Sequence, residues 1–253
     1  MITLDRLDND LSGWLARTLI APGLLRPEEF EAAFVAVVTA AATDPDAAWL
    51  AFYRNTVAAL SGHAVPGGTN AELTPVYQRA AELVVGPEVV ELGCCFGFLA
   101  LRLAEAGHRV TAVDISPGTV ALLARMAPAL GVHLDAVVGD AHAPPLASGS
   151  ADTVLAVHLL EHLPEASSGA VLLEMLRLAR RRVVVAVPYE PVPNPTWGHV
   201  RRFDHEALRD LGRGTGRPYQ VTDHHGGWLV VEAGPTAPAV GQERDDHGPE
   251  NLV

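Results

Sequence analysis

The sequence contains no lysine, only two cysteines and few aromatic residues. Its 18 basic residues are therefore all arginine, and its formal net charge is −12. A chain this acidic lacks the basic surface on which nonspecific binding to nucleic acid or to anionic membranes depends, so we expect neither partner. Cys94 and Cys95 are adjacent and cannot form a relaxed disulfide with each other, which favours a reduced, cytoplasmic protein.

Long apolar runs are also absent. The longest, over residues 32–42, includes Thr39 and is too short to span a bilayer. The first residues mix acidic with apolar side chains, unlike a signal peptide. A chain of 253 residues, 49% of them hydrophobic, is long enough for one sizeable core plus an appended element.

A glycine-containing turn at residues 91–99, E-L-G-C-C-F-G-F-L, separates an apolar β-type run from an amphipathic segment. Glycines at such a turn let the backbone bend and approach a ligand without a Cβ clash. The helix that follows directs its free N–H groups and the positive end of its dipole at the turn. The turn therefore predicts a site for a nucleotide-like or anionic ligand.

From residue 86 the pattern alternates strand and helix, which predicts an α/β fold with a mainly parallel sheet. The expected strands are 88–92, 109–115, 134–138, 153–157 and 182–188, followed by a possible hairpin of 220–223 and 228–232. Residues 1–85 predict an N-terminal helical extension whose fourth helix begins at Thr74-Pro75. This extension is either a packed layer or a lid over an acceptor. Residues 86–234 form the main domain, and residues 235–253 predict a disordered tail.

Polar residues follow successive strands, at the sheet edge where α/β folds bind ligands. Two cofactor classes fit this arrangement. A dinucleotide site requires G-x-G-x-x-G/A, but Cys95 replaces the second glycine and Phe98 the last position. Glu91, two residues before Gly93, is poorly placed beside a pyrophosphate and well placed beside the cationic amino acid end of S-adenosylmethionine. An NAD-dependent oxidoreductase and a non-catalytic, cofactor-binding partner protein remain as alternatives.

Four motifs carry a family resemblance: V-E-L-G-C-C-F-G at 90–97, V-D-I-S at 113–116, G-D-A at 139–141 and L-L-E-H-L-P at 159–164. A fifth, H-V-R-R-F at 199–203, follows the fifth expected strand. Residues 86–210 thereby resemble the class I S-adenosylmethionine-dependent methyltransferases of small molecules, which implies a Rossmann-like, seven-stranded, mainly parallel sheet. The resemblance implies cofactor contacts from Glu91, Gly93, Cys95, Gly97, Asp114, Ile115, Asp140, Ala141 and His158.

Within that set, the resemblance places Glu91, Gly93 and Gly97 at the methionine end of the cofactor and Asp114 at its ribose. Ile115 and Ala141 would enclose the adenine, and Asp140 would bind the exocyclic amine of that ring. Cys95 stands where the family has glycine.

Methyl transfer to a hydroxyl needs a positioned oxygen and a base, and histidine has a suitable pKa. His162 is the first candidate base, Glu161 a residue that orients it or the acceptor, and His199 the second candidate base. The H-x-x-E-H spacing at 158–162 also matches inverted zincins. That chemistry needs both histidines on one helix face, but the motif follows a β-type run and precedes Pro164. We therefore expect no metal.

The segment 189–203 is a proline-stiffened loop whose amides, aromatic rings and charges suit a hydroxyl-rich acceptor. Arg201 and Arg202 either hold a carboxylate or phosphate or belong to a structural turn anchored by Phe203. The motifs at 95–99, 114–120, 156–163, 180–188 and 198–203 also resemble the mycofactocin oligosaccharide methyltransferases. That narrower resemblance implies methylation of a glucose hydroxyl on a glycan acceptor. The oligomeric state is left open.

Overall fold

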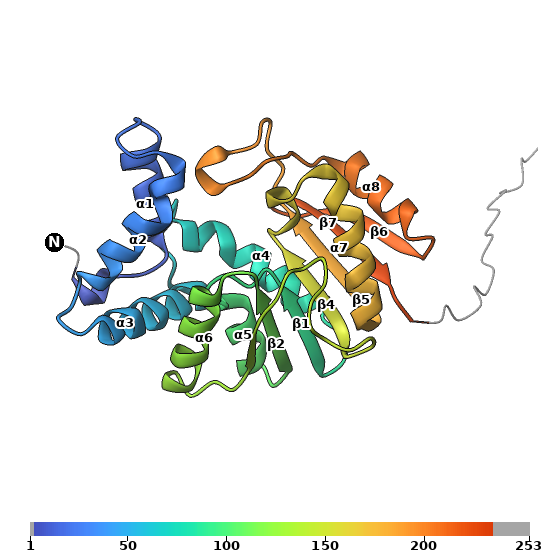
Figure 1. The fold of residues 1–253 in the computed structure, drawn as a ribbon, viewed down its shortest axis with the longest axis horizontal. Helices are drawn as coiled ribbons and strands as arrows, with labels where there is room; N and C mark the ends of the chain where they lie inside the picture. The colour runs from blue at the N-terminus through green and yellow to red at the C-terminus, as the bar shows by residue number, and fades with distance from the viewer. Residues whose placement is uncertain (1–2, 235–253) are drawn as a thin grey trace, which may run out of the picture.

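A computed structural model describes residues 3–234, so the predicted tail at 235–253 lies outside the described residues. Its centre is one seven-stranded sheet in the order β3-β2-β1-β4-β5-β7-β6 (Figure 1). The strands are β1 (Glu88–Leu92), β2 (Arg109–Asp114), β3 (Asp135–Val138), β4 (Ala151–Val157), β5 (Ala179–Val187), β6 (Tyr219–Asp223) and β7 (Gly227–Glu232). The first five strands are parallel, whereas β7 pairs antiparallel with both β5 and β6. The predicted Rossmann-like, mainly parallel, seven-stranded fold is confirmed.

Each face of the sheet has its own hydrophobic core. Val89 faces one core and Val90 the other, as the alternation of side chains along a strand requires. The first core takes side chains from α4 (Thr69–Leu83), α5 (Phe98–Glu105) and α6 (Pro117–Ala129); the second takes them from α7 (Glu165–Leu178) and α8 (His205–Gly214). All seven residues of the central strand β4 are buried, which fits a strand covered on both faces.

The N-terminal region is helical, as predicted. It contains α1 (Asp10–Leu15), α2 (Phe30–Thr39) and α3 (Pro45–Ala58) before α4. Short 3₁₀ segments occur at Leu4–Arg6, Pro27–Glu29, Leu160–His162 and Pro195–Trp197, and π-helical segments at Ala16–Ile20 and Ala59–His63. No helix among residues 3–234 is long and apolar enough to cross a membrane.

The predicted start of α4 at Thr74-Pro75 is wrong, because the helix begins at Thr69 and contains Pro75 in its interior. Its first turn is capped from another helix: Asp10 Oδ1 accepts a hydrogen bond from the Asn70 backbone N–H at 2.8 Å. A partner 60 positions away supplies the N-terminal acceptor that helices require, so the local sequence carries no capping signal.

Aromatic rings join the N-terminal helices to the glycine turn. The Phe52 ring of α3 lies 5.4 Å from the Phe96 ring, and Tyr53 lies 5.2 Å from Phe98. The Tyr53 hydroxyl also donates to the Phe96 carbonyl at 2.9 Å. These rings belong to the same buried core as α4 and α5, so the helical layer supports the turn directly. Its possible action as a lid stays a prediction.

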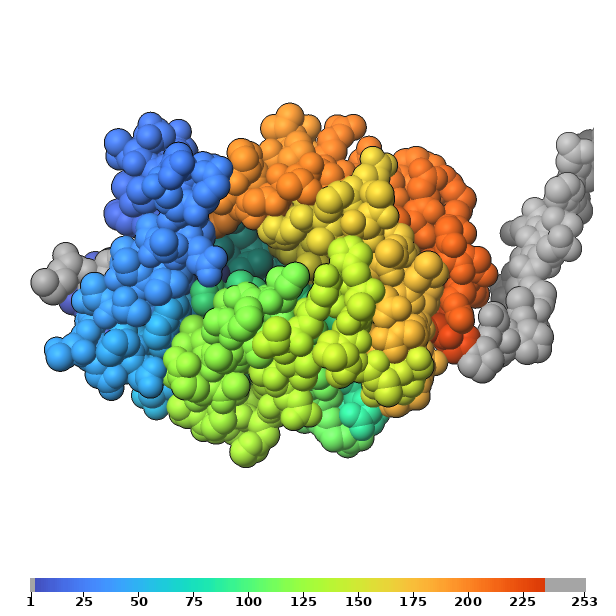
Figure 2. Space-filling view, in the orientation of Figure 1, coloured from blue at the N-terminus to red at the C-terminus, as the bar shows by residue number. Residues whose placement is uncertain are grey.

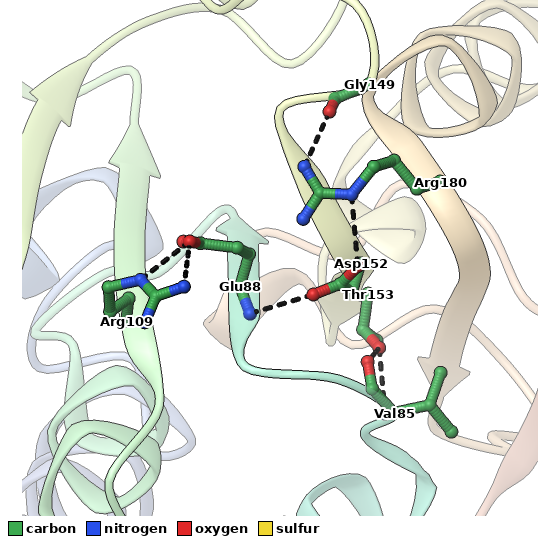
Figure 3. A network of polar contacts seen from close by, with 7 residues as sticks. All are labelled: Val85, Glu88, Arg109, Gly149, Asp152, Thr153 and Arg180. Carbon is green, nitrogen blue, oxygen red and sulfur yellow. Dashed lines mark hydrogen bonds and ion pairs between the residues drawn. The ribbon is translucent and has the colours of Figure 1, made fainter.

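The amino ends of the strands are held by a polar network (Figure 3). The Asp152 carboxylate accepts from Arg180 Nε at 3.0 Å and from the Glu88 backbone N–H at 3.1 Å. Arg109 Nε donates to Glu88 at 2.6 Å, which connects β2 to β1. These contacts link four strands at this end of the sheet, so the candidate site residues at the carboxyl ends stand on a fixed scaffold.

Candidate active site

The glycine turn after β1 is shaped by positive φ angles and by packing. Gly93 has φ +74° and Gly97, the N-cap of α5, has φ +77°. A Cβ on Gly93 would lie 2.7 Å from the Leu159 side chain, and one on Gly97 would overlap Leu123. Both positions therefore require glycine for the turn itself, whatever ligand lies above it.

Cys95 has a φ of +49°, in the left-handed region that suits glycine and strains most other residues. Its backbone N–H donates to Asp114 Oδ2 at 2.8 Å, while its side chain is exposed. Cys94 is buried, and both thiols are free, in agreement with the predicted absence of a disulfide between them. Cys95 thus keeps the backbone shape of the glycine it replaces and adds a thiol to the site.

Asp114, at the end of β2, is fixed from two sides. Besides Cys95, the Ser116 backbone N–H donates to Asp114 Oδ1 at 2.9 Å, just before Ser116 caps α6. Each carboxylate oxygen can accept a further hydrogen bond. The half-buried Asp114 is therefore an oriented double acceptor, as two neighbouring ribose hydroxyls would require.

Glu91 lies beneath the turn and is only 4% exposed. Its Oε2 has no hydrogen-bond partner. Burial raises the pKa of Glu91 to about 8; a backbone hydrogen bond from Ala100 opposes this rise and the nearby Asp114 charge adds to it. A buried carboxyl group with an unpartnered oxygen is costly unless a ligand, above all a cationic one, completes its bonding.

The expected adenine side lies at the ends of β2 and β3. Ile115 is 69% exposed, which leaves it free to contact a ring. Asp140 Oδ1 accepts from the backbone N–H of His142 at 2.8 Å and lies 2.8 Å from its Nδ1. These hydrogen bonds lower the pKa of Asp140. No motif of the sequence predicts His142 as a site residue, but its position two residues after an aspartate is the signal for this local turn.

The three predicted catalytic residues meet after β4. The His162 and His199 rings lie edge to face with centroids 4.9 Å apart, although 37 positions separate them in sequence. One potential ligand atom from each of Glu161, His162 and His199 lies within 4.8 Å of the others. Glu161 is 1% exposed, and neither of its carboxylate oxygens has a partner. His158, which begins this segment, has a strained φ of +54°.

Burial shifts the pKa values of this cluster. It raises the pKa of Glu161 to about 8, and the nearby Glu190 adds to the rise. It lowers the pKa of His162, where the His199 charge acts in the same direction, and lowers that of His158 to about 4. At neutral pH the cluster therefore contains a protonated Glu161 together with His158 and His162, whose lowered pKa values favour the neutral imidazole.

The loop after β5 is attached to this cluster. The Val200 backbone N–H donates to the Glu161 carbonyl at 2.9 Å, and His199 Nδ1 lies 2.8 Å from Glu190 Oε2. Across the cleft, Trp197 of the loop meets Phe30 at 5.6 Å between ring centroids. The loop therefore bridges the cluster and the N-terminal helices.

The two arginines of the loop point elsewhere. Arg201 Nη1 donates to Ser168 Oγ at 2.8 Å, and its guanidinium lies 4.1 Å from the centroid of the Phe203 ring. Arg202 is exposed and lies 3.7 Å from the Asp204 carboxylate. This arrangement favours the structural turn over the anion-holding role that the sequence also allowed.

A cavity of about 480 Å³ lies between the N-terminal helices and the glycine turn. Its walls include Phe34 and Trp49 on one side and Cys95, Phe96 and Asp114 on the other. In Figure 2 the surface is hollowed where the blue N-terminal helices, the orange loop after β5 and the yellow segment after β4 meet. Another cavity, of about 430 Å³ between α7 and α8, includes Arg201 but none of the predicted catalytic or cofactor-binding residues.

Comparison with known families agrees with this geometry. Residues 89–182 match the model of a family described as "Methyltransferase domain". The matched residues include β1 to β4 and the start of β5, which form the parallel part of the sheet. A ubiquinone biosynthesis O-methyltransferase of Methylocella silvestris is 35% identical over 89 residues, 35% of either chain. A probable S-adenosylmethionine-dependent methyltransferase of Mycolicibacterium smegmatis is 34% identical over 88 residues, 35% of this chain and 33% of that protein. The alignments thus span about a third of these curated relatives.

Solved structures extend the likeness to the fold. Magnesium protoporphyrin IX methyltransferase from Synechocystis, with bound SAH, has a TM-score of 0.50 and 17% identity, over 71% of this chain and 92% of that one. The [4+2]-cyclase SpnF has a TM-score of 0.51 and 20% identity, over 63% of this chain and 62% of that one. Because a cyclase shares the architecture, the fold alone does not define the reaction, and activity has to be argued from the site.

Proposed function

We propose that this protein transfers a methyl group from S-adenosylmethionine to a hydroxyl of a polar small molecule, with a glucose hydroxyl of a mycofactocin-type oligosaccharide as the first acceptor. One observation carries the proposal. Three acidic groups, Glu91, Asp114 and Glu161, follow or end the neighbouring strands β1, β2 and β4 on the same edge of the sheet. Each has the environment that its role in methyl transfer needs.

The residues present fit the cofactor. Glu91 offers the unpartnered Oε2 to the cationic amino end, and Asp114 offers an oriented carboxylate to the ribose. Ile115 presents an exposed apolar face on the adenine side, next to Asp140. When bound, S-adenosylmethionine supplies an electrophilic methyl group on a positively charged sulfur. The chain contributes binding, orientation and a proton acceptor.

The proton acceptor is assigned to the cluster after β4. Partial burial of the His162 ring lowers its pKa, which favours the neutral form that takes a hydroxyl proton. His199 is the second candidate, held at Nδ1 by Glu190. The polar lining of this cluster supports a hydroxyl-bearing acceptor.

Methylation of a phenol and dinucleotide-dependent oxidoreduction are the two alternative functions. The relatives named for ubiquinone biosynthesis raise a phenolic hydroxyl as the second acceptor to test. A dinucleotide oxidoreductase is disfavoured, because the Cys95 N–H is engaged by Asp114 and the buried Phe98 packs on Tyr53. A pyrophosphate would need that N–H and a small residue at position 98.

Titration calorimetry with S-adenosylhomocysteine tests the proposal first. We expect binding, and we expect Asp114→Ala to weaken it about 10–100-fold through loss of charged hydrogen bonds worth roughly 1.5–3 kcal/mol. No binding at millimolar ligand would remove the methyltransferase assignment. Transfer of labelled methyl groups to glycan and phenol acceptors then separates the two substrates. His162→Ala should retain binding and lose turnover; turnover equal to that of the unaltered protein would move the base to His199.

A further inference from the structure

We infer that Glu161, His162 and His199 form a binding site for a divalent transition-metal ion at the acceptor side of the cleft. One potential ligand atom from each residue lies within 4.8 Å of the others. Ligand atoms held at about 2.0–2.2 Å from one ion lie about 3–3.6 Å apart, so small side-chain rotations close the site. Two imidazoles and a carboxylate favour Zn²⁺, Co²⁺ or Mn²⁺ over Mg²⁺ or Ca²⁺, which prefer oxygen.

The unpartnered Glu161 carboxyl group is the independent observation that points to a ligand. It is 1% exposed, and neither oxygen has a hydrogen-bond partner among the described residues. Such a group costs about 1–3 kcal/mol even when neutral, and a bound cation would satisfy it. His162 and His199 are the groups that the structure brings within ligand distance of it to complete a set of three.

The surroundings also suit a metal. His199 Nδ1 lies 2.8 Å from the Glu190 carboxylate, and a hydrogen bond there leaves Nε2 available as a ligand. A carboxylate behind a histidine fixes the ring and raises its basicity in metal sites. The backbone N–H groups of Val200 and Arg201 donate to the Glu161 carbonyl and hold the loop against the 3₁₀ turn, so the ligand residues are close together without an ion.

A metal ion at this position differs from the sequence-based prediction of no metal. That prediction concerned a zinc site on an H-x-x-E-H helix, and the structure has no such helix at this position, because residues 160–162 form a single 3₁₀ turn after β4. The ligand set differs: His199 comes from a distant loop. The site itself is independent of the proposed function. Its role, to bind an oxygen of the acceptor and fix its position, rests on that function, and it is an alternative to a base role for His162 or His199, because an imidazole nitrogen that binds a metal cannot also accept a proton.

Metal binding to the untagged full chain tests the site without measuring activity. Chelator-treated protein is titrated with Co²⁺ and Zn²⁺, and bound metal is followed by elemental analysis and by visible absorption of Co²⁺. We expect the unaltered protein to bind one equivalent of metal per chain. The metal affinity of His199→Ala and of Glu161→Gln should be at least 10-fold lower, and that of Glu190→Gln about 10-fold lower. Thermal melting confirms that each variant is folded, and His199→Ala decides the result if Glu161→Gln does not fold.

The matched control is His205→Ala, which removes a histidine paired in the same way with a carboxylate, Asp223, at 3.1 Å. It should bind metal as the unaltered protein does. Absence of stoichiometric binding, or equal binding by His199→Ala and the unaltered protein, would overturn the site. Full methyl transfer by metal-free protein would overturn its role and leave the methyltransferase intact. Metal binding without binding of S-adenosylhomocysteine would overturn the proposed function alone.

Discussion

Replacing Glu91 with glutamine should stabilise the ligand-free protein at high pH and destabilise it at low pH. The raised pKa of about 8, against an ordinary 4.5, means that ionised Glu91 opposes folding. At about 1.4 kcal/mol per pH unit, this opposition is under 1 kcal/mol at pH 5, about 3 kcal/mol at pH 7 and about 5 kcal/mol above pH 8. The penalty grows as pH rises from 4.5 to 8 because Glu91 loses its proton in the unfolded state over this range but keeps it in the folded state.

The glutamine removes this pH-dependent penalty, but at the position where Oε2 has no partner its NH2 group carries one more donor than the protonated acid, at a cost of about 1–3 kcal/mol. Glu91→Gln should therefore be about 1 kcal/mol less stable than the unaltered protein at pH 5 and about 2–4 kcal/mol more stable above pH 8. The latter corresponds to a rise of about 5–15 °C in melting temperature.

Thermal melting of both proteins between pH 5 and pH 8.5, without ligand, measures the difference. Glu88→Gln is the control, because Glu88 lies at the other end of the same strand and faces Arg109, away from the cleft. Its difference from the unaltered protein should stay constant over this range. A Glu91→Gln difference that stays constant or shrinks as pH rises would refute the assignment of Glu91 as a protonated, buried acid.

Three further predictions concern the same turn. Binding of S-adenosylhomocysteine at pH 7 should release about one proton, because a cationic partner ionises Glu91; calorimetry in phosphate and in Tris buffer measures this, and Glu91→Gln should abolish it. Cys95→Gly should raise the free energy of unfolding by up to about 1 kcal/mol, since relief of the positive φ exceeds the added chain entropy. A denaturant midpoint lower than that of the unaltered protein would contradict this. Gly97→Ala should lower the free energy of unfolding by about 2 kcal/mol or more, because of its positive φ and its overlap with Leu123. Gly107 also has a positive φ but has open space around it, so Gly107→Ala should lower the free energy of unfolding by only about 1 kcal/mol.

The strand boundaries were predictable where local chemistry marks both ends. The bounds of β1 agree with the prediction residue for residue, because Pro87 precedes the strand and Gly93 follows it. The start of α4 was not predictable, since Asp10 caps it from another helix. Local signals thus define elements whose ends are satisfied locally, and tertiary hydrogen bonds override them elsewhere.

The candidate site divides in the same way. Glu91 and Asp114 could be placed from sequence because each occupies a fixed position at the end of its strand, and strand order then brings them together. The pairing of His199 with Glu190 and the lack of any partner for Glu161 depend on the path of the loop after β5. That path is determined by contacts such as the one between Trp197 and Phe30, which no motif encodes.

The two buried glutamates with unpartnered oxygens both lie at the edge of the sheet that holds the candidate site. These glutamates are Glu91 and Glu161, and two of the three non-glycine residues with positive φ among residues 3–234, Cys95 and His158, belong to the same candidate site. At the opposite edge, Asp152 has its partners in place. Strain and unsatisfied acids persist in a fold only where the scaffold tolerates them, and a cation at either glutamate would relieve the cost. In the proposed arrangement the two glutamates therefore provide two separate positions for positive charge: one beneath the glycine turn for the methyl donor, and one beside His162 and His199 for a metal ion that holds the acceptor.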